Sequence, residues 1–282
     1  MTQGMNTQEM MELALEMAGF DETPEDSAIY VPGDGIRRIL FGIDVEAAEL
    51  HIAQQLGYDA AVAHHPTGCL PASWPVFMRH VDQMVAAGVP ESAAQEVAER
   101  MATRLRRMDM LANYDHVPSV ARLLGMPYMN IHSPLDEIGR QRIQAEIDAC
   151  RSANPDVTLQ GVIDHLMGMP EYQTAATQPE VVLGDPDARA GQAVLSHAAL
   201  DNGGFPVADA YFEHGVDTVI YIHLDEPELQ KLRQVGRGQI IVLGHIASDS
   251  AGINPFIEAL EERGLEVDRI DVVPPQSTKP DE

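Results

Sequence analysis

Basic residues are scarce in this chain: 18 Lys and Arg stand against 44 Asp and Glu, which gives a formal net charge of −26. A negative field of this size repels a phosphate backbone, so the composition argues against general nucleic-acid binding. The acidic residues are scattered along the chain, which is typical of a solvated surface.

Cysteine and long apolar segments are also scarce. The two cysteines, Cys69 and Cys150, are too few for a disulfide framework, so a reducing compartment is expected. No apolar run approaches the ~20 residues that cross a bilayer. Residues 1–8 are polar and lack the pattern of a signal peptide. We therefore expect a cytoplasmic protein without membrane contact.

What the chain does contain is enough apolar sequence for a core: 45% of its 282 residues are hydrophobic and 22% are charged. Strand-like and helical segments alternate in both halves, which predicts an α/β fold with two lobes. Strands are expected at residues 36–45, 59–63, 127–131, 181–183, 193–195, 218–222, 239–243 and 266–272. Helices are expected at residues 5–18, 46–56, 138–150, 159–167, 205–214, 227–235 and 251–263, with a largely helical stretch over 83–124.

The lobes are expected to divide at a segment without strong periodicity. Residues 169–179 are rich in Pro, Gln and Thr, so we place a linker at 169–180. It would join an N-terminal lobe, residues 1–168, to a C-terminal lobe, residues 181–282, and the two lobes are free to form one compact unit. The opening strand–helix–strand, residues 36–63, implies a parallel pair of strands because such crossovers are right-handed.

Metal-binding residue types follow three of the expected strands. His64 and His65 follow strand 59–63, Asp136 follows strand 127–131, and His245 follows strand 239–243. In parallel α/β sheets, ligands bind outside the carboxyl ends of the strands. Asp249 lies four residues after His245 and can share a helix face with it. Three imidazoles and two carboxylates suit zinc, iron, manganese or cobalt, and a carboxylate can bridge two ions about 3.5–4 Å apart.

Each of these residues also has an ordinary structural interpretation. A single histidine is more often a surface or core residue than a ligand, and neighbours such as His64 and His65 point apart on a regular strand unless the chain turns, as Pro66 favours. Other candidates stay open. Cys69 is either a soft ligand or a buried thiol, and Asp44 either orients a ligand histidine or caps a helix. His132 and His223 are candidates for supporting or substrate-contacting roles.

Three blocks, in this order, resemble the Nif-three-like proteins, also called the GTP cyclohydrolase I type 2 family. They are residues 39–66 (ILFGIDVEAAELHIAQQLGYDAAVAHHP), residues 131–136 (IHSPLD) and residues 244–252 (GHIASDSAG). The resemblance implies two related α/β lobes with mixed or parallel sheets and a dinuclear metal site in the cleft between them. It also implies a homohexamer. The metal ligands that it implies are His64, His65, Asp136, His245 and Asp249.

The chain departs from the family pattern at three places. Asp249 stands where the family usually has glutamate, Ser133-Pro134 replaces Thr-Asn, and Tyr221-Ile222-His223 replaces Thr-Gly-Glu. The expected function is a hydrolase in which two divalent ions, with Asp136 and Asp249 as the catalytic carboxylates, activate water against a nucleotide-like or cyclic-amide substrate. The alternative is a metal-binding adaptor or regulatory protein without catalytic activity. Open coordination positions would favour the enzyme.

Overall fold

The computed structural model describes residues 4–275, and its internal contacts divide the chain into two compact units. Of the described residues, unit 1 comprises those up to Val76, Arg104–Ile138 and Gly252–Val272, and unit 2 comprises Phe77–Thr103, Gly139–Ala251 and those from Val273 on. This division differs from the predicted boundary at residues 169–180. That segment lies inside unit 2, where Tyr172 of helix α9 (Pro170–Thr174) is fully buried. Residues Gly252–Val272, which include most of the last helix and the whole last strand, belong to unit 1, and this strand pairs within the same sheet as the first strands of the chain.

The sheet of unit 1 has five strands in the order β1-β4-β3-β2-β9. Their bounds are Ala28–Val31 for β1, Arg38–Gly42 for β2, Ala60–Ala63 for β3, Tyr128–Asn130 for β4 and Glu266–Ile270 for β9. Only the edge strand β1 is antiparallel to its neighbour. The predicted parallel pairing of the first two strand segments is confirmed in β2 and β3.

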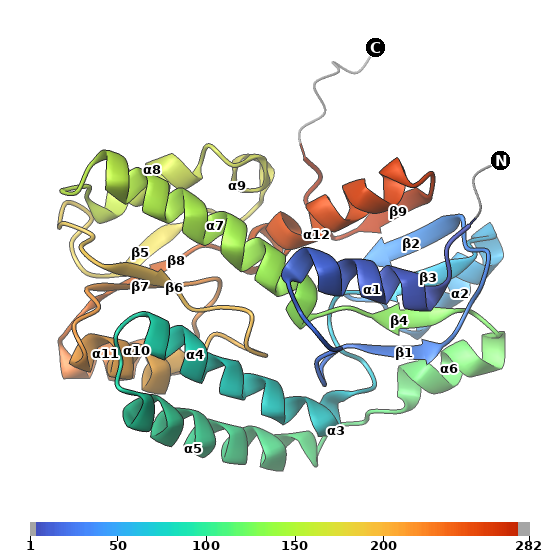
Figure 1. Cartoon of the computed structure of the whole chain (residues 1–282), viewed down its shortest axis with the longest axis horizontal. Coiled ribbons are helices and arrows are strands. Elements are labelled where there is room, and N and C mark those ends of the chain that lie inside the picture. Colours follow the sequence, from blue (N-terminus) through green and yellow to red (C-terminus); the bar gives the residue numbers. More distant parts are fainter. Residues whose placement is uncertain (1–3, 276–282) are drawn as a thin grey trace. The chain divides into compact units, whose positions relative to one another are not determined.

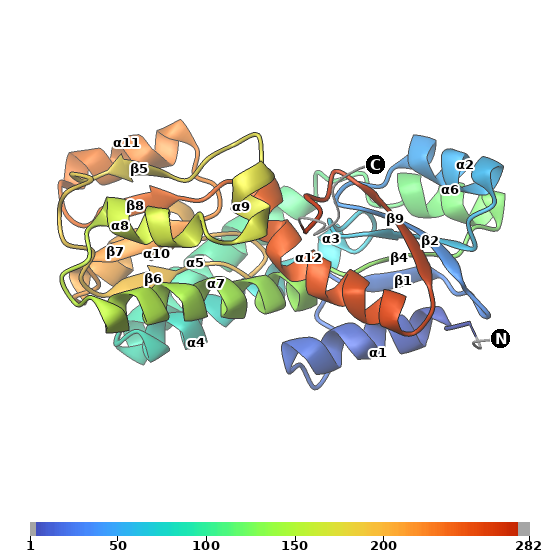
Figure 2. The same ribbon diagram turned by 90° about the horizontal axis from the view of Figure 1, so that it is seen from above.

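Helices cover both faces of this sheet because side chains alternate along each strand. Ile39 and Phe41 of β2 pack with α1 (Thr7–Ala18) and with the unit 1 part of α12 (His245–Glu262). Leu40 faces the other way, toward α2 (Ala47–Leu56) and α6 (His116–Leu124). Figure 2 shows α2 and α6 on one side of the sheet and α1 on the other. Unit 1 is therefore a three-layer α/β/α structure.

The sheet of unit 2 has four strands in the order β5-β8-β7-β6. Their bounds are Glu180–Leu183 for β5, Ala193–Leu195 for β6, Thr218–Tyr221 for β7 and Gln239–Val242 for β8. Only β5 is antiparallel to its neighbour. The core on one face comes from α7 (Ser133–Ala153), α8 (Leu159–Leu166) and α9, while α10 (Gly204–Glu213) and α11 (Glu226–Val235) cover the other face (Figure 1).

The two units repeat one topology. Replacing β1, β2, β3 and β4 by β5, β6, β7 and β8 converts the order of the first sheet into that of the second, and β9 is the one addition. In both sheets the antiparallel edge strand has a register shift, between Ile29 and Val31 in β1 and between Val181 and Leu183 in β5. The prediction that the chain contains two α/β lobes of related topology is thus confirmed.

The remaining helices connect these layers. They are α3 (Leu70–Ser73), a short 3-10 helix (Trp74–Met78), α4 (Arg79–Ala86) and α5 (Glu91–Asp109). Most predicted elements are found near their expected ends, although α7 and α12 begin five and six residues before the predicted starts, and β1, α3, the 3-10 helix and α9 were not predicted. Within residues 4–275, no helix is long and apolar enough to cross a membrane.

A histidine and carboxylate cluster as candidate metal centre

In unit 1, the paired histidines and His132 come from neighbouring parallel strands. Ala63 at the end of β3 is in register with Asn130 at the end of β4, so the residues that follow both strands lie side by side. The rings of His64 and His132 have centroids 5.0 Å apart, and those of His64 and His65 are 5.2 Å apart. One ring nitrogen of each of the three histidines lies within 4.8 Å of those of the other two. Because the chain turns after β3, the adjacent side chains of His64 and His65 both lie in the same cluster with His132.

Each of these three imidazoles is oriented through its Nδ1 atom. His64 Nδ1 donates to the carbonyl oxygen of Ile131 at 3.0 Å. His65 Nδ1 donates to Asp44 Oδ1 at 2.8 Å, and His132 Nδ1 donates to Asp26 Oδ2 at 2.8 Å. These oxygen atoms can only accept, so a hydrogen is assigned to Nδ1 in all three rings, which leaves Nε2 as the atom that can bind a metal. This is the arrangement that metal-ligating histidines almost always have.

Asp136 adds a carboxylate to the same cluster. It lies in the first turn of α7, and its Oδ1 atom is 3.1 Å from His64 Nε2, with both side chains buried. Burial lowers the pKa of His132, but the carboxylates of Asp136 and Asp26 outweigh this effect and raise the pKa to about 9. The potential that holds a proton here would equally attract a divalent cation, so these residues fit a metal.

A buried polar network supports the loop that carries the histidines. The Tyr128 hydroxyl donates to the carbonyl oxygen of Val45 at 3.0 Å. The Tyr30 hydroxyl accepts the N–H of Gly68 at 2.9 Å and donates to Asn130 Oδ1 at 2.6 Å, and the two tyrosine rings stack with centroids 5.3 Å apart. These contacts join the loop after β3 to strands β1 and β4, and so fix the backbone that presents the histidines.

Cys69 belongs to this supporting network. Its Sγ atom lies 3.4 Å from the Tyr30 hydroxyl and 3.6 Å from Asn130 Oδ1. Burial raises the pKa of the thiol to about 11, so the thiol stays protonated at neutral pH. Of its two interpretations, the structure favours the buried thiol.

Unit 2 contains a histidine–aspartate pair that resembles His132 and Asp136 of unit 1. His245 and Asp249 lie at the start of α12, directly after β8, with His245 Nε2 3.1 Å from Asp249 Oδ2. Asp249 is buried, and the His245 side chain is 42% exposed. The ring of His223, two residues after β7, lies 4.8 Å from that of His245, and His223 Nε2 contacts Asn202 Nδ2 at 3.0 Å.

The two units present these residues at equivalent positions. His132 and Asp136 open the helix after β4, just as His245 and Asp249 open the helix after β8, and both pairs have the same spacing of four residues. The structure brings together His64, His65 and Asp136 within unit 1, and His245 and Asp249 within unit 2. The sequence did not reveal Asp26, which lies 106 residues before its partner His132 and has no motif around it.

Comparison with known proteins identifies the class of this α/β chain. A NIF3 superfamily protein from Sphaerobacter thermophilus is 46% identical and has a TM-score of 0.93, with 95% of this chain and 99% of that one covered. Reduced HcgD from Methanocaldococcus jannaschii has the same fold at 14% identity and a TM-score of 0.60, covering 95% of this chain and all of that one. A Bacillus cereus protein related to NIF3 is 12% identical with a TM-score of 0.52, and 98% of each chain is covered. The sequence matches no protein-family model and no curated protein.

The first of these likenesses decides the family, because nearly half of the aligned residues are identical over almost the whole length of both chains. The chain belongs to the NIF3 superfamily. The resemblance seen in the sequence motifs is thereby confirmed, while the other two likenesses show the fold alone.

Proposed function

We propose that this chain binds two divalent metal ions and uses them to hydrolyse a small-molecule substrate of nucleotide-like or cyclic-amide class. The observation that carries the proposal is the set of three imidazoles in unit 1, each held by an oxygen acceptor at Nδ1: His64 and His65, which are proposed ligands, and His132, a supporting residue beside them. A histidine that only packs in a core has no need of two neighbouring imidazoles whose Nδ1 atoms are hydrogen-bonded in the same way. Proteins build this arrangement to aim Nε2 lone pairs at a metal.

The proposed ligands are His64, His65 and Asp136 from unit 1, with His245 and Asp249 from unit 2. This donor set of imidazoles and carboxylates suits zinc, iron, manganese or cobalt better than calcium or magnesium. When bound, such ions would acidify water and so supply a nucleophile near neutral pH. Asp136 and Asp249 would offset part of the positive charge. Asp44 would keep the ligand His65 in position, and Asp26 would hold His132, a supporting residue beside the ligands.

The test is a metal-dependent hydrolysis assay with two variants at one position. Metal-loaded protein is screened against nucleotides, dinucleotides and cyclic amides. We expect Asp249→Asn to abolish hydrolysis, because it removes a carboxylate charge while keeping nearly the same shape. Asp249→Glu should retain activity, because glutamate is the residue that the resembling family usually has there. Activity should rise with pH as the activated water ionises.

Two results would count against the enzyme. Equal signals from the wild type and Asp249→Asn across the panel would leave no hydrolysis to assign to the metals. An experimental structure of the metal-loaded protein in which side chains fill every coordination position would indicate the adaptor instead, because no position would be left for water.

A further inference from the structure

Unit 1 contains a pocket of about 690 Å³ beside the histidine cluster. This volume lies within the range of small-molecule sites, roughly 300–1,000 Å³. The walls come from the segments that follow β2 and β3 and from residues 112–117, which lead into α6. His65 belongs both to this wall and to the proposed ligand set. The pocket is thus placed to hold the organic part of a substrate.

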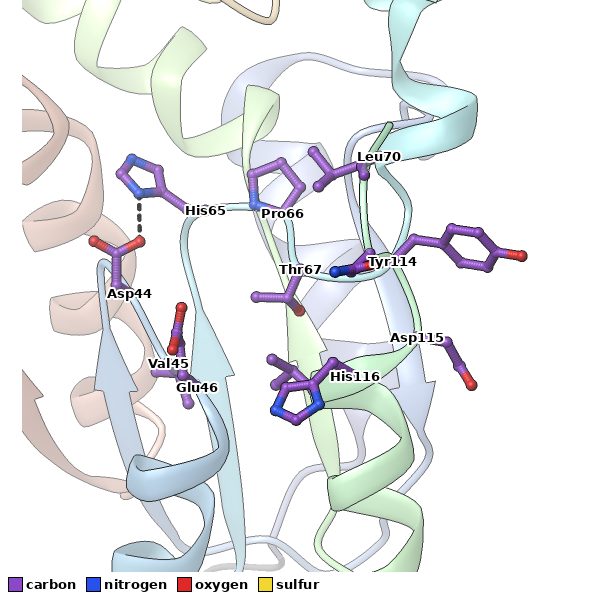
Figure 3. A pocket seen from close by; sticks show the side chains of 13 residues that line it. Asp44, Val45, Glu46, His65, Pro66, Thr67, Leu70, Tyr114, Asp115 and His116 are labelled. Carbon is purple, nitrogen blue, oxygen red and sulfur yellow. Dashed lines mark hydrogen bonds and ion pairs between the residues drawn. The ribbon is translucent and has the colours of Figure 1, made fainter. Parts of the chain in front are cut away.

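The charges of the pocket are one-sided. Asp44 and Glu46 line one side, and Figure 3 shows them across from His116 and Tyr114, with Thr67 between. Among the described residues that line the pocket, none is Lys or Arg. The third carboxylate, Asp115, is already paired with Arg122 and accepts a hydrogen bond from Ser119. Asp44 and Glu46 therefore dominate the local potential.

The rest of the lining is suited to a flat, weakly polar body. Pro66, Leu70 and Val117 contribute apolar surface, and Thr67 contributes a hydroxyl that contacts Tyr128 at 2.8 Å. Glu46 is the N-cap residue of α2, so the backbone of a helix start fixes where its side chain begins. The side chain itself is exposed, and a carboxylate can accept two parallel N–H bonds from a planar donor pair such as an amidine.

We propose that this pocket binds a planar nitrogen compound, uncharged or cationic, whose adjacent N–H donors face Glu46. An anion of the same shape is disfavoured, because the described lining offers it carboxylates and neither Lys nor Arg. The role of the pocket as a substrate site rests on the proposed metal-dependent function, because His65 is both a lining residue and a proposed metal ligand. Its ability to bind a planar N–H donor depends on the lining residues alone and is tested separately from the metals.

The experiment compares benzamidine with benzoate, two planar probes of nearly equal shape and opposite charge. Their binding is measured by calorimetry or by ligand-observed NMR on the full chain, with and without added zinc. We expect saturable benzamidine binding at millimolar concentration, at least about tenfold tighter than benzoate. Glu46→Gln should weaken benzamidine binding by about tenfold, which is the usual size of a charged hydrogen-bond contribution.

Glu16→Gln is the matched control, because Glu16 is an exposed glutamate of α1 and its replacement changes the net charge by the same amount. Equal benzamidine affinity in Glu46→Gln and Glu16→Gln would overturn the proposal, as would no saturable binding in the wild type or benzoate binding as tight as benzamidine. Metal content is measured on the same samples. Loss of benzamidine binding in Glu46→Gln without metal would support the pocket even if the metal-dependent activity failed.

Discussion

An imidazole is an effective metal ligand only when its ring is held in one orientation, and in this chain that is done by residues far away in sequence. Asp26 is fully buried and accepts the Nδ1–H of His132 at 2.8 Å. It also accepts a hydrogen bond from the hydroxyl of Ser133, so one carboxylate fixes both the ring and the start of α7. Asp44 does the same for His65 from the loop after β2. Carboxylates that orient histidines near a metal in this way contribute to its affinity.

We predict that Asp26→Asn weakens zinc binding by about 10- to 100-fold, the usual effect of removing a carboxylate that orients a histidine near a metal. Asparagine keeps the shape but removes the charge, and its amide can also turn an N–H group toward the ring. Competition with a chromogenic chelator measures the change in affinity. Asp21→Asn, an exposed aspartate five residues earlier, is the control. An unchanged zinc affinity in Asp26→Asn would show that His132 has no part in the site.

The ligand candidates could be predicted from the sequence because they directly follow apolar strand segments, as His64 and His65 follow β3 and His245 comes just after β8. Their partners could not. Asp26 precedes a short edge strand, and its contact with His132 exists only because β1 pairs with β4. Nothing near Asp26 in the sequence marks it as different from other acidic residues of this chain.

Among the elements, helix α4 has a structural task in unit 2. Three of its side chains bind backbone carbonyl oxygens in the loop between β6 and α10: Arg79 Nε binds that of Ala198 at 3.0 Å, His80 Nε2 that of Asp201 at 3.1 Å, and Gln83 Nε2 that of His197 at 2.6 Å. Ala198 and Leu200 in this loop have positive φ angles of 62° and 73°. Non-glycine residues seldom adopt this conformation, so the contacts from α4 stabilise a strained loop.

His80 should make the stability of the chain depend on pH. Its ring is fully buried, and burial lowers its pKa to about 3. The unfolded chain binds a proton on this residue below about pH 6.5, while the folded chain does not. The stabilisation is therefore complete above pH 6.5 and is lost as the pH falls toward 3, by up to about 1.4 kcal/mol per pH unit.

The measurement is the free energy of unfolding in urea at several pH values for the wild type, His80→Gln and His51→Gln. We expect the wild type and His51→Gln, whose histidine is exposed on α2, to lose stability in parallel below pH 6.5. His80→Gln, already destabilised at neutral pH, should have a shallower slope. Identical slopes for all three proteins would mean that His80 accepts a proton in the folded state.

Strand β1 and helix α9, which the sequence did not predict, share one physical cause. Strand β1 has only four residues and is half-buried, and it becomes a strand by pairing with β4, about a hundred residues later. The segment 169–180 reads as a linker because it lacks periodicity, yet Tyr172 within it packs into the core of unit 2 and its hydroxyl lies 3.0 Å from Ser248 Oγ. Such elements form because of tertiary contacts between distant segments, and the local sequence pattern does not contain information on those contacts.

At the scale of the whole molecule, the main feature is a repeated topology that places a His–Asp pair at the start of an equivalent helix in each unit. The sequence conceals this repeat, because the two motifs, HSPLD at 132–136 and HIASD at 245–249, are identical at only two of five positions, the histidine and the aspartate. The expected assembly into a homohexamer remains a prediction. With a net charge of −26 per chain, such an assembly needs apolar contact or local charge matching, and high salt should favour it or leave it unchanged.

Whether the chain binds two metal ions can be measured directly by elemental analysis of protein that has been loaded with zinc and freed of excess metal by gel filtration. We predict close to two zinc ions per chain for the wild type and for His51→Ala. His64→Ala should bind markedly less, because it removes the buried imidazole that faces Asp136. A wild-type protein that retains no zinc, or a His64→Ala variant with the same metal content as the wild type, would contradict the account.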